Sequence, residues 1–156
     1  MENNDFLRRI EDLAERCEKT ASLTHTAFLT PAEQYELNNW AKYHPDHRIV
    51  LNGGHPECER KLAFFLPYYM DESDVDISEY VCSFGTKSCF GSPTHRDYMG
   101  AVLGLGIKRS FLGDIWVDGD EATLFCMTSV QRHIIDEYKS DMLQYAPVAD
   151  KPRIRE

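Results

Sequence analysis

The segment GDIWVDGDEATLFCMT, residues 113–128, constrains the fold more than any other part of this chain. Two runs of mostly apolar residues, DIWV and ATLFCM, flank the segment DGDE. Asp118 and Gly119 form a dipeptide that favours the tight turn of a β-hairpin. The sequence therefore predicts two antiparallel strands here, and their apolar face must pack against other elements of the fold.

Helical periodicity is present on both sides of this hairpin. Residues 4–20 place apolar side chains at i, i+3, i+4 and i+7, which predicts an amphipathic helix. A second helix is predicted to follow Thr30, because Thr30 is a good N-cap, Pro31 suits the first helical position and Glu33 completes a capping box. Residues 129–143 carry one more apolar stripe and predict a helix after the hairpin.

Shorter apolar runs predict the remaining strands. RIVLNGG (48–54) predicts a strand that ends in a glycine turn, KLAFFLP (61–67) a buried strand, and ISEYVCSFG (77–85) a strand with one imperfect step in its alternation. HPECER (55–60) can form a short helical turn, and DESDVD (71–76) predicts a solvated acidic loop. With the helices, these strands predict an α+β sandwich whose sheet is largely antiparallel.

The triplet HRD, residues 95–97, also occurs in the catalytic loop of protein kinases. In that loop an asparagine follows the aspartate five residues later, and here Val102 occupies that position. The triplet instead fits the first turn of a helix, with Thr94 as N-cap and Asp97 completing a capping box. Gly100 and Gly104 lie within this helix and predict that it packs tightly on the sheet; a phosphate loop would need glycines before the helix.

Composition limits the classes of function. The chain has 156 residues and a formal net charge of -9, so a nucleic-acid-binding role requires basic residues gathered on one face. The first residues lack the apolar core of a signal peptide, and no apolar run approaches the length of a membrane span. Five cysteines without a CxxC pair favour a reducing, cytoplasmic compartment with mostly buried thiols.

Metal and thiol chemistry have few candidates. The possible ligands lack the paired spacing of a structural zinc site, and we expect neither a metal nor a cofactor. A catalytic cysteine would be Cys58, near His55 and Arg60, although a buried thiol in a turn is the more common reading. No other set of residues predicts an active site, so we expect a protein that is not an enzyme. The possible ligands are His44, His47, His55, His95, Cys58, Cys82 and Cys89.

Basic residues form three small clusters, at a strand start, a helix start and a helix end. They are Arg60-Lys61, Arg96 and Lys108-Arg109. In an α+β sandwich such junctions can converge on one edge, and an arginine can donate two hydrogen bonds to one phosphate. The alternative is an ordinary solvated surface whose cations pair with neighbouring carboxylates.

Three blocks of the sequence, taken together, resemble the YlmH family of bacterial RNA-binding proteins. They are FLTPAEQYEL, GGHPECERKLAFFLP and HRDYMGAVLGLGIKRSFLGDIWV, in order within residues 28–143. The two helices predicted before residue 45 form an N-terminal helical extension (1–45), and the resemblance implies that an RRM-like, ferredoxin-like α+β domain (46–148) follows it. Residues 149–156 are then expected to be a linker toward a C-terminal alpha-L RNA-binding module, which is absent from this sequence.

The resemblance also implies a non-enzymatic, ribosome-associated protein. Members of the family act with the large ribosomal subunit and tRNA in the rescue of stalled nascent chains, and they often carry a cell-division label. A protein–protein module that contacts a ribosomal or cell-division partner is the alternative. The aromatic signature of an RRM is not identifiable, since Phe64 and Phe65 face opposite sides of a strand. The candidate RNA-binding residues are Arg60, Lys61, His95, Arg96, Lys108 and Arg109.

Overall fold

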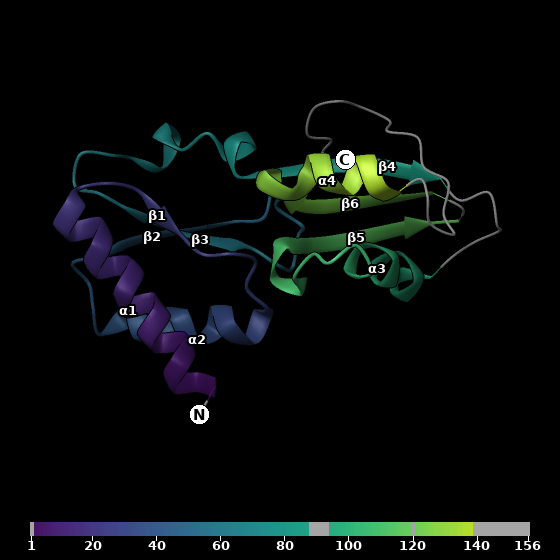
Figure 1. Ribbon diagram of the computed structural model, residues 1–156. Helices are drawn as coiled ribbons and strands as arrows, with labels where there is room; N and C mark the ends of the chain where they lie inside the picture. The colour runs from purple at the N-terminus through teal and green to yellow at the C-terminus, as the bar shows by residue number, and fades with distance from the viewer. Residues whose placement is uncertain (1, 88–93, 120, 139–156) are drawn as a thin grey trace. The chain divides into compact units, whose positions relative to one another are not determined.

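The computed structural model describes residues 2–87, 94–119 and 121–138 (Figure 1). The chain divides into two compact units. Unit 1 comprises residues 1–53 and 59–76, and unit 2 comprises residues 54–58 and 77–156. Each unit contains helices and a three-stranded antiparallel sheet, which confirms the predicted α+β class.

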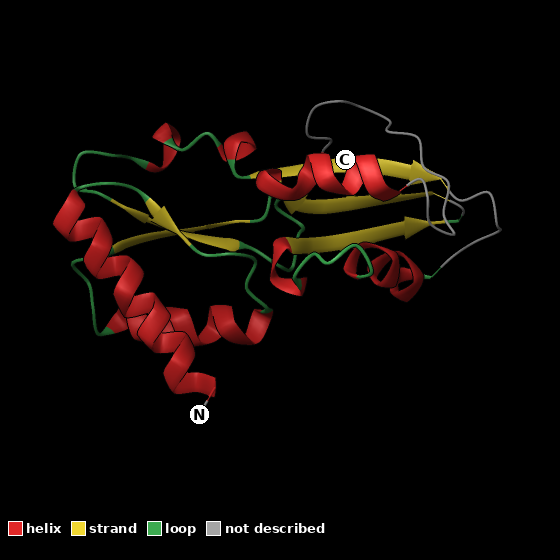
Figure 2. Cartoon of the chain, in the orientation of Figure 1, coloured by secondary structure: helices red, strands yellow, loops and turns green. Residues whose placement is uncertain are grey.

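Unit 1 packs two helices against one face of its sheet, as Figure 2 shows. The strand order is β1-β3-β2, and all pairs are antiparallel. The central strand β3 is buried along its whole length, so Phe64 and Phe65 both belong to the interior. The elements are α1 (Glu2–Thr20), β1 (Thr24–His25), α2 (Pro31–Lys42), β2 (Arg48–Asn52) and β3 (Leu62–Leu66).

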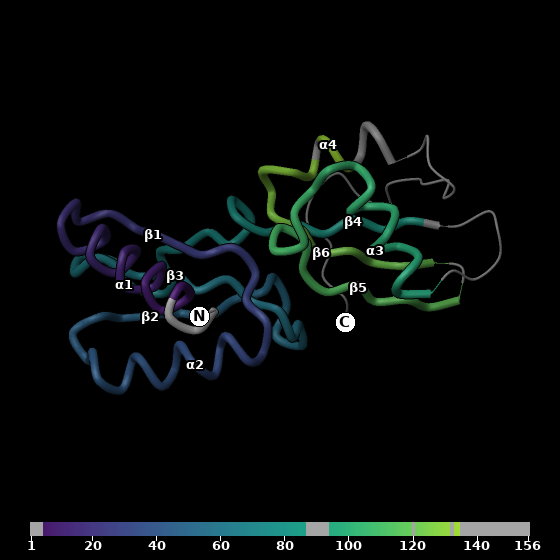
Figure 3. Tube along the Cα trace, turned by 60° about the horizontal axis from the view of Figure 1, so that its bottom comes forward, coloured from purple at the N-terminus to yellow at the C-terminus, as the bar shows by residue number. Residues whose placement is uncertain are grey.

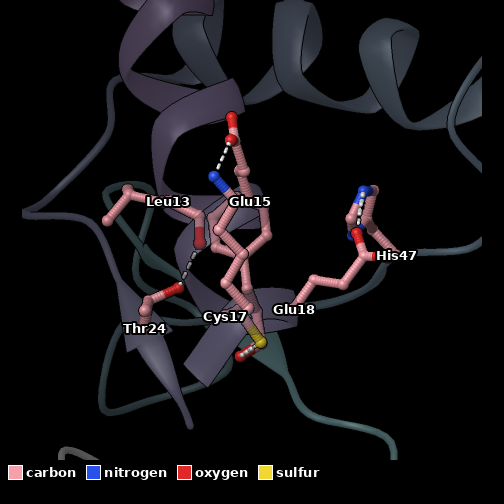
Figure 4. Close-up of polar contacts among 8 residues, drawn as sticks. Leu13, Glu15, Cys17, Glu18, Thr24 and His47 are labelled. Carbon is pink, nitrogen blue, oxygen red and sulfur yellow. Dashed lines mark hydrogen bonds and ion pairs between the residues drawn. The ribbon is translucent and has the colours of Figure 1, made fainter. Parts of the chain in front are cut away.

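Helix α1 is fixed to this sheet by polar contacts as well as by its apolar stripe (Figure 4). The hydroxyl of Thr24 on β1 donates to the Leu13 carbonyl at 2.8 Å, and the Cys17 thiol donates to the Phe65 carbonyl at 3.2 Å. On the exposed side of the helix, Lys19 pairs with Glu15 at 2.6 Å and lowers the pKa of that carboxyl group. The stripe predicted for residues 4–20 is therefore the buried face of α1.

The start of α2 confirms the predicted capping box. The Glu33 amide donates to the Thr30 hydroxyl at 3.2 Å, and the Thr30 amide donates to the Glu33 carboxylate at 3.0 Å. Pro31 occupies the first turn, where its missing N–H leaves no hydrogen bond unmade. The local sequence thus defines where this helix begins.

Unit 2 has the chain order β4, α3, β5, β6, α4, and Figure 3 shows β6 between β4 and β5. The crossover through α3 joins two strands that are separated by β6, which is the split βαβ arrangement of ferredoxin-like folds. The predicted hairpin is confirmed, with Gly119 at φ 65° in its turn. The elements are β4 (Val81–Lys87), α3 (His95–Leu103), β5 (Leu112–Asp118), β6 (Glu121–Met127) and α4 (Thr128–Tyr138).

The two faces of this sheet are covered differently. Apolar side chains of α3 and α4, such as Tyr98 and Ile134, share a core with Phe84 and Leu124. On the opposite face, the segment 54–58 approaches the strands. A Cβ atom on Gly54 would lie 2.9 Å from a methyl group of Val81 and 3.5 Å from the Phe125 ring. Gly54 also has φ +94°, so this position requires glycine for two separate reasons.

Three local predictions are wrong. The helix α3 does not use its glycines to approach the sheet, because Gly100 is exposed and a Cβ there would meet nothing within 4 Å. Residues Ile77–Glu79 form a 3-10 helix, and the strand begins only at Val81. Residues 55–60 form a turn closed by a hydrogen bond from the Cys58 amide to the His55 carbonyl, without a helix.

The predicted domain boundaries stay a prediction. In the structure, β2 and β3 belong to unit 1 together with α1 and α2, because their register pairs them with β1. Residues Glu72–Asp74 and Arg109–Phe111 add two further 3-10 turns. Cys89, the linker predicted for 149–156 and the last residues of the helix predicted for 129–143 lie outside the described residues.

Candidate nucleic-acid interface

The first turn of α3 presents two of the candidate residues. Thr94 is the N-cap, its amide donates to the Asp97 carboxylate at 2.8 Å, and the Asp97 amide donates to the Thr94 hydroxyl at 3.4 Å. This capping box confirms the structural role predicted for Asp97. His95 and Arg96 lie between the two capping residues, and both side chains are exposed.

The position of Arg96 is electrostatically unfavourable for the helix itself. The N-terminus of a helix carries a partial positive charge, so a cation there costs stability instead of adding to it, by about 0.3–1 kcal/mol. The one carboxylate in this turn, Asp97, already accepts from Thr94. Within the described residues, no ion pair links Arg96 to a carboxylate, and an external anion would satisfy both the side chain and the helix end.

Lys108 and Arg109 follow the other end of α3. Lys108 is exposed and precedes the 3-10 turn Arg109–Phe111. Arg109 is half-buried, and its guanidinium donates to the Leu112 carbonyl at 2.6 Å, where β5 begins. Arg109 thus supports the backbone between α3 and β5, and Lys108 is the more accessible cation of the pair.

His133 on α4 is a residue that sequence reasoning missed. Its Nε2 atom lies 3.1 Å from the Leu105 carbonyl, which places this exposed imidazole at the end of α3 that leads to Lys108. The contact joins residues 28 positions apart, so no local pattern could have shown it. The end of α3 therefore combines a lysine, an arginine and a histidine.

Arg60 and Lys61 lie in unit 1, at the start of β3. Lys61 forms a backbone bridge with Leu29, in which the Leu29 amide donates to the Lys61 carbonyl at 2.8 Å. The Gln34 side chain donates to the Glu59 carbonyl at 2.7 Å and fixes the preceding residue. Both cations are half-buried. The six candidate residues are thus divided between the units: Arg60 and Lys61 in unit 1, and His95, Arg96, Lys108 and Arg109 in unit 2.

The sheet face of unit 2 that does not contact α3 offers little room for stacked bases. Ser83 and Phe125 on this face are each 1% exposed. Trp116 packs edge-on against Phe125, with ring centroids 4.7 Å apart, and His55 packs edge-on against Trp116 at 5.1 Å. Aromatic side chains here contact one another, whereas an RRM presents them to RNA.

The metal and thiol candidates do not assemble into a site. Among the described residues, no three His, Cys, Asp or Glu side chains are grouped as metal ligands. His44 and His47 instead stack on Trp40, with centroid distances of 3.9 and 5.8 Å. Cys58 is 2% exposed, which does not suit a nucleophile. No helix in the described part of the chain has the length and apolar character needed to cross a membrane.

Unit 1 contains a hollow of about 330 Å³ between the end of α1 and the loops beside β2 and β3. Its lining includes the Glu18 carboxylate and the His47 imidazole, which lie 4.0 Å apart and are labelled in Figure 4. Arg48 also lines it, but the guanidinium donates to the Pro67 and Met70 carbonyls and lies 3.7 Å from Asp71. These contacts show that Arg48 stabilises the fold of unit 1. The carboxylates of Glu18 and Asp46 in the lining would repel a phosphate.

Comparisons with known proteins also divide the chain into two segments, although residues 54–58 and 71–76 fall on the other side of that division than in the structure. Residues 71–144 match the family model described as "Putative RNA-binding domain in YlmH", and residues 2–67 match the model described as "YlmH, N-terminal". The first of these segments contains the helix α3 and the cations at both of its ends.

Two individual relatives point the same way. A Bacillus subtilis (strain 168) protein, named "Ribosome-associated protein quality control protein P2", is 36% identical over 92 residues, which are 58% of this chain and 35% of the relative. The solved structure of the "Cell division protein ylmH from Streptococcus pneumoniae" matches with a TM-score of 0.80 and 18% identity, over 96% of this chain and 92% of that one. At that identity the match concerns the fold. With two YlmH models matching consecutive segments of it, the chain belongs to the YlmH family.

Proposed function

We propose that unit 2 binds RNA through its phosphates, by means of the cations at the two ends of α3. Arg96 and Lys108 make the main contacts, His95 adds a hydrogen bond, and the half-buried Arg109 makes a smaller contribution. The observation that carries the proposal is the position of exposed cations at both ends of a helix inside the segment that matches the YlmH RNA-binding model.

The geometry of α3 supports contact with a backbone more than recognition of bases. A helix of nine residues is about 14 Å long, so its two ends can address separate phosphates of one strand. The aromatic side chains of the sheet are packed among themselves, which leaves phosphates as the accessible partners of this unit. Contacts of this kind position a protein on RNA without reading its sequence.

The ribosome is the proposed location of this RNA. The name of the Bacillus subtilis relative supports association with ribosomes and a part in quality control. On this basis we propose ribosomal RNA and tRNA of the large subunit as the ligands, and the rescue of stalled nascent chains, in the cytoplasm, as the process. The protein has no catalytic role in this proposal.

Salt dependence tests phosphate contact directly. The affinity of the full chain for purified 50S subunits is measured between about 50 and 200 mM salt. The logarithm of the binding constant falls linearly with the logarithm of the salt concentration, and each lost phosphate contact makes this slope shallower by about 0.7–0.9. Arg96→Gln and Lys108→Gln should each weaken binding several-fold and reduce the slope. Lys42→Gln, at an exposed lysine in the last turn of α2, is the matched control and should change neither. An affinity that does not vary with salt contradicts the proposal.

Arg60 and Lys61 are proposed as additional contacts from unit 1. Their side chains are half-buried, so we expect smaller effects than for Arg96 and Lys108. Lys61→Gln in the same assay shows whether unit 1 participates. An unchanged slope in this variant, with a reduced slope for Lys108→Gln, would restrict the RNA-binding surface to unit 2.

A second candidate function, contact with a protein partner, is supported by the surface of unit 1. This unit has fourteen acidic and eight basic residues, a net charge of -6, which disfavours RNA. It also exposes four tyrosines, a residue type enriched in protein interfaces. The double variant Tyr68→Ser, Tyr69→Ser should leave the salt slope unchanged but lower the affinity for intact subunits if this surface contacts a protein. The four are Tyr35, Tyr43, Tyr68 and Tyr69, with exposed fractions of 69%, 83%, 87% and 60%.

A further inference from the structure

Two cysteines of unit 2 face each other across the sheet. Cys82 on β4 and Cys126 on β6 are direct partners in the antiparallel register, and their sulfur atoms are 3.6 Å apart. The Cys82 thiol also lies 3.8 Å from the Cys126 carbonyl. The residues are 44 positions apart in the sequence, so the sheet alone brings the two thiols together.

The backbone at this pair already has the spacing of a disulfide. Directly opposed residues in antiparallel strands have Cα atoms about 4.5–5.5 Å apart, and disulfides span Cα distances of about 4.4–6.8 Å. The sulfur atoms must approach from van der Waals contact to a bond of about 2.05 Å, which rotation of the two side chains can supply.

The thiols differ in environment. Cys126 lies on the central strand of the sheet and is 0% exposed, and the adjacent Cys82 thiol together with burial raises the pKa of Cys126. Cys82 is on β4, an edge strand within the described sheet, and the hydrogen bond with Cys126 lowers its pKa. Cys82 is itself only 2% exposed, so a small oxidant reaches it when the edge strand β4 frays, whereas Cys126 stays covered on the central strand.

We propose that Cys82 and Cys126 form a modification site, a dithiol that closes to a disulfide when a hydroperoxide oxidises it. The Cys82 thiolate attacks one peroxide oxygen, the O–O bond breaks, and the second oxygen leaves as water after protonation, so that Cys82 becomes a sulfenic acid. The Cys126 sulfur then attacks the Cys82 sulfur, the S–O bond breaks, and a second water leaves. Two thiols and one hydrogen peroxide give one disulfide and two waters.

The bond closes a covalent loop between residues 82 and 126. This loop contains α3 and β5 and fastens the edge strand β4 to the central strand β6. Closing a loop of this length restricts the unfolded chain, which raises the melting temperature of unit 2 by at least about 5 °C. The inference concerns the chain's thiols alone and does not depend on RNA binding.

Mass spectrometry of the full chain tests the site. The reduced, folded protein is treated with a small excess of hydrogen peroxide, quenched, unfolded in the presence of an alkylating reagent and digested. We expect the loss of two hydrogen atoms, a linked pair of peptides that contain Cys82 and Cys126, and full reversal by a thiol reductant. The melting temperature of the oxidised protein should rise by the stated amount.

Variants separate this pair from the other thiols. Cys82→Ser should abolish the linked peptides and the shift in melting temperature, whereas Cys17→Ser, at a thiol that is 4% exposed in unit 1, should preserve both. Because the first experiment uses the unaltered chain, its outcome stands even where a variant folds poorly. Oxygen adducts on separate cysteines without the 82–126 link, or a link that forms only in denaturant, overturns the proposal.

Discussion

In the residues that the structure describes, both units combine two α-helices with a three-stranded antiparallel sheet, yet they differ in burial and charge. In unit 1 the central strand β3 is buried at every residue, and the net charge is -6. In unit 2 the central strand β6 begins exposed at Glu121, and twelve acidic residues oppose nine basic ones, a net charge of -3. The less acidic unit is also the one that corresponds to the RNA-binding family model.

The helices α2 and α3 also differ, in the residues that follow their N-caps. Both begin with a threonine capping box, but α2 continues with Pro31, which suits a helix start, and α3 continues with His95 and Arg96, which do not. The two helix starts have the same local structure. In α2 the residue after the cap stabilises the helix, whereas in α3 the residues after the cap do not. The following four predictions test this difference.

The largest effect is expected in the core of unit 1. Phe65→Ala removes a ring that is 1% exposed and should destabilise the protein by about 3–5 kcal/mol. Tyr35→Ala, at a ring of the same unit that is 69% exposed, should change stability by less than about 0.5 kcal/mol. Urea unfolding measures both variants, and similar losses for the two would show that β3 is not the centre of this core.

Next in size is the glycine that lies against the sheet of unit 2. Gly54→Ala introduces a Cβ atom 2.9 Å from Val81 at a φ of +94°, and should cost about 2–4 kcal/mol. Gly100→Ala is the matched control, because its Cβ meets nothing and helix propensity improves by about 0.5–1 kcal/mol. Thermal unfolding should therefore shift in opposite directions for these two glycines, and a shared direction would contradict the packing described for residues 54–58.

The two capping boxes should contribute alike. Thr30→Ala removes the hydrogen bond from the Glu33 amide, and Thr94→Ala removes the equivalent bond from the Asp97 amide together with a 3.2 Å bond from the Thr94 hydroxyl to the Asp97 carboxylate. Each variant should cost about 1 kcal/mol. The corresponding serine variants keep an acceptor and should retain most of that stability. If only one of the alanine variants loses stability in urea unfolding, the equivalence of the two helix starts is refuted.

The smallest effect on stability is expected at Arg96. This substitution also tests most directly the difference between the starts of α2 and α3. Arg96→Gln removes a cation from the positive end of α3 and should increase the free energy of unfolding by about 0.3–1 kcal/mol. The same variant should bind 50S subunits several-fold more weakly. A variant that loses stability and retains binding would show that Arg96 serves the fold.

Local signals in the sequence predicted most individual elements. The hairpin, both capping boxes and the stripe of α1 depend on residues within a few positions of one another, and all are present in the structure. The three wrong predictions concern the packing of Gly100, the start of the strand β4 and the conformation of residues 55–60, none of which a local pattern defines. Gly54 fits a simple glycine turn in the sequence, and only the structure shows its close contact with Val81 and Phe125.

The candidate site shows the same limit. Sequence patterns identified Arg96 and Lys108 as ends of one helix, but could not show that Arg109 donates to Leu112 or that His133 reaches the Leu105 carbonyl. Whether the candidate cations of both units act on one surface stays a prediction. Such side-chain hydrogen bonds arise from tertiary contacts, which cannot be recognised from residue spacing or composition.

The path of the chain has a practical consequence for dissecting this protein. Residues 54–58 belong to unit 2, although the chain returns to unit 1 for residues 59–76 before it completes unit 2. A fragment cut between the two family segments, near residue 70, would leave the Gly54 turn behind and uncover Val81 and Phe125. Such a fragment is expected to aggregate, so the two halves are better studied by point substitution than by excision.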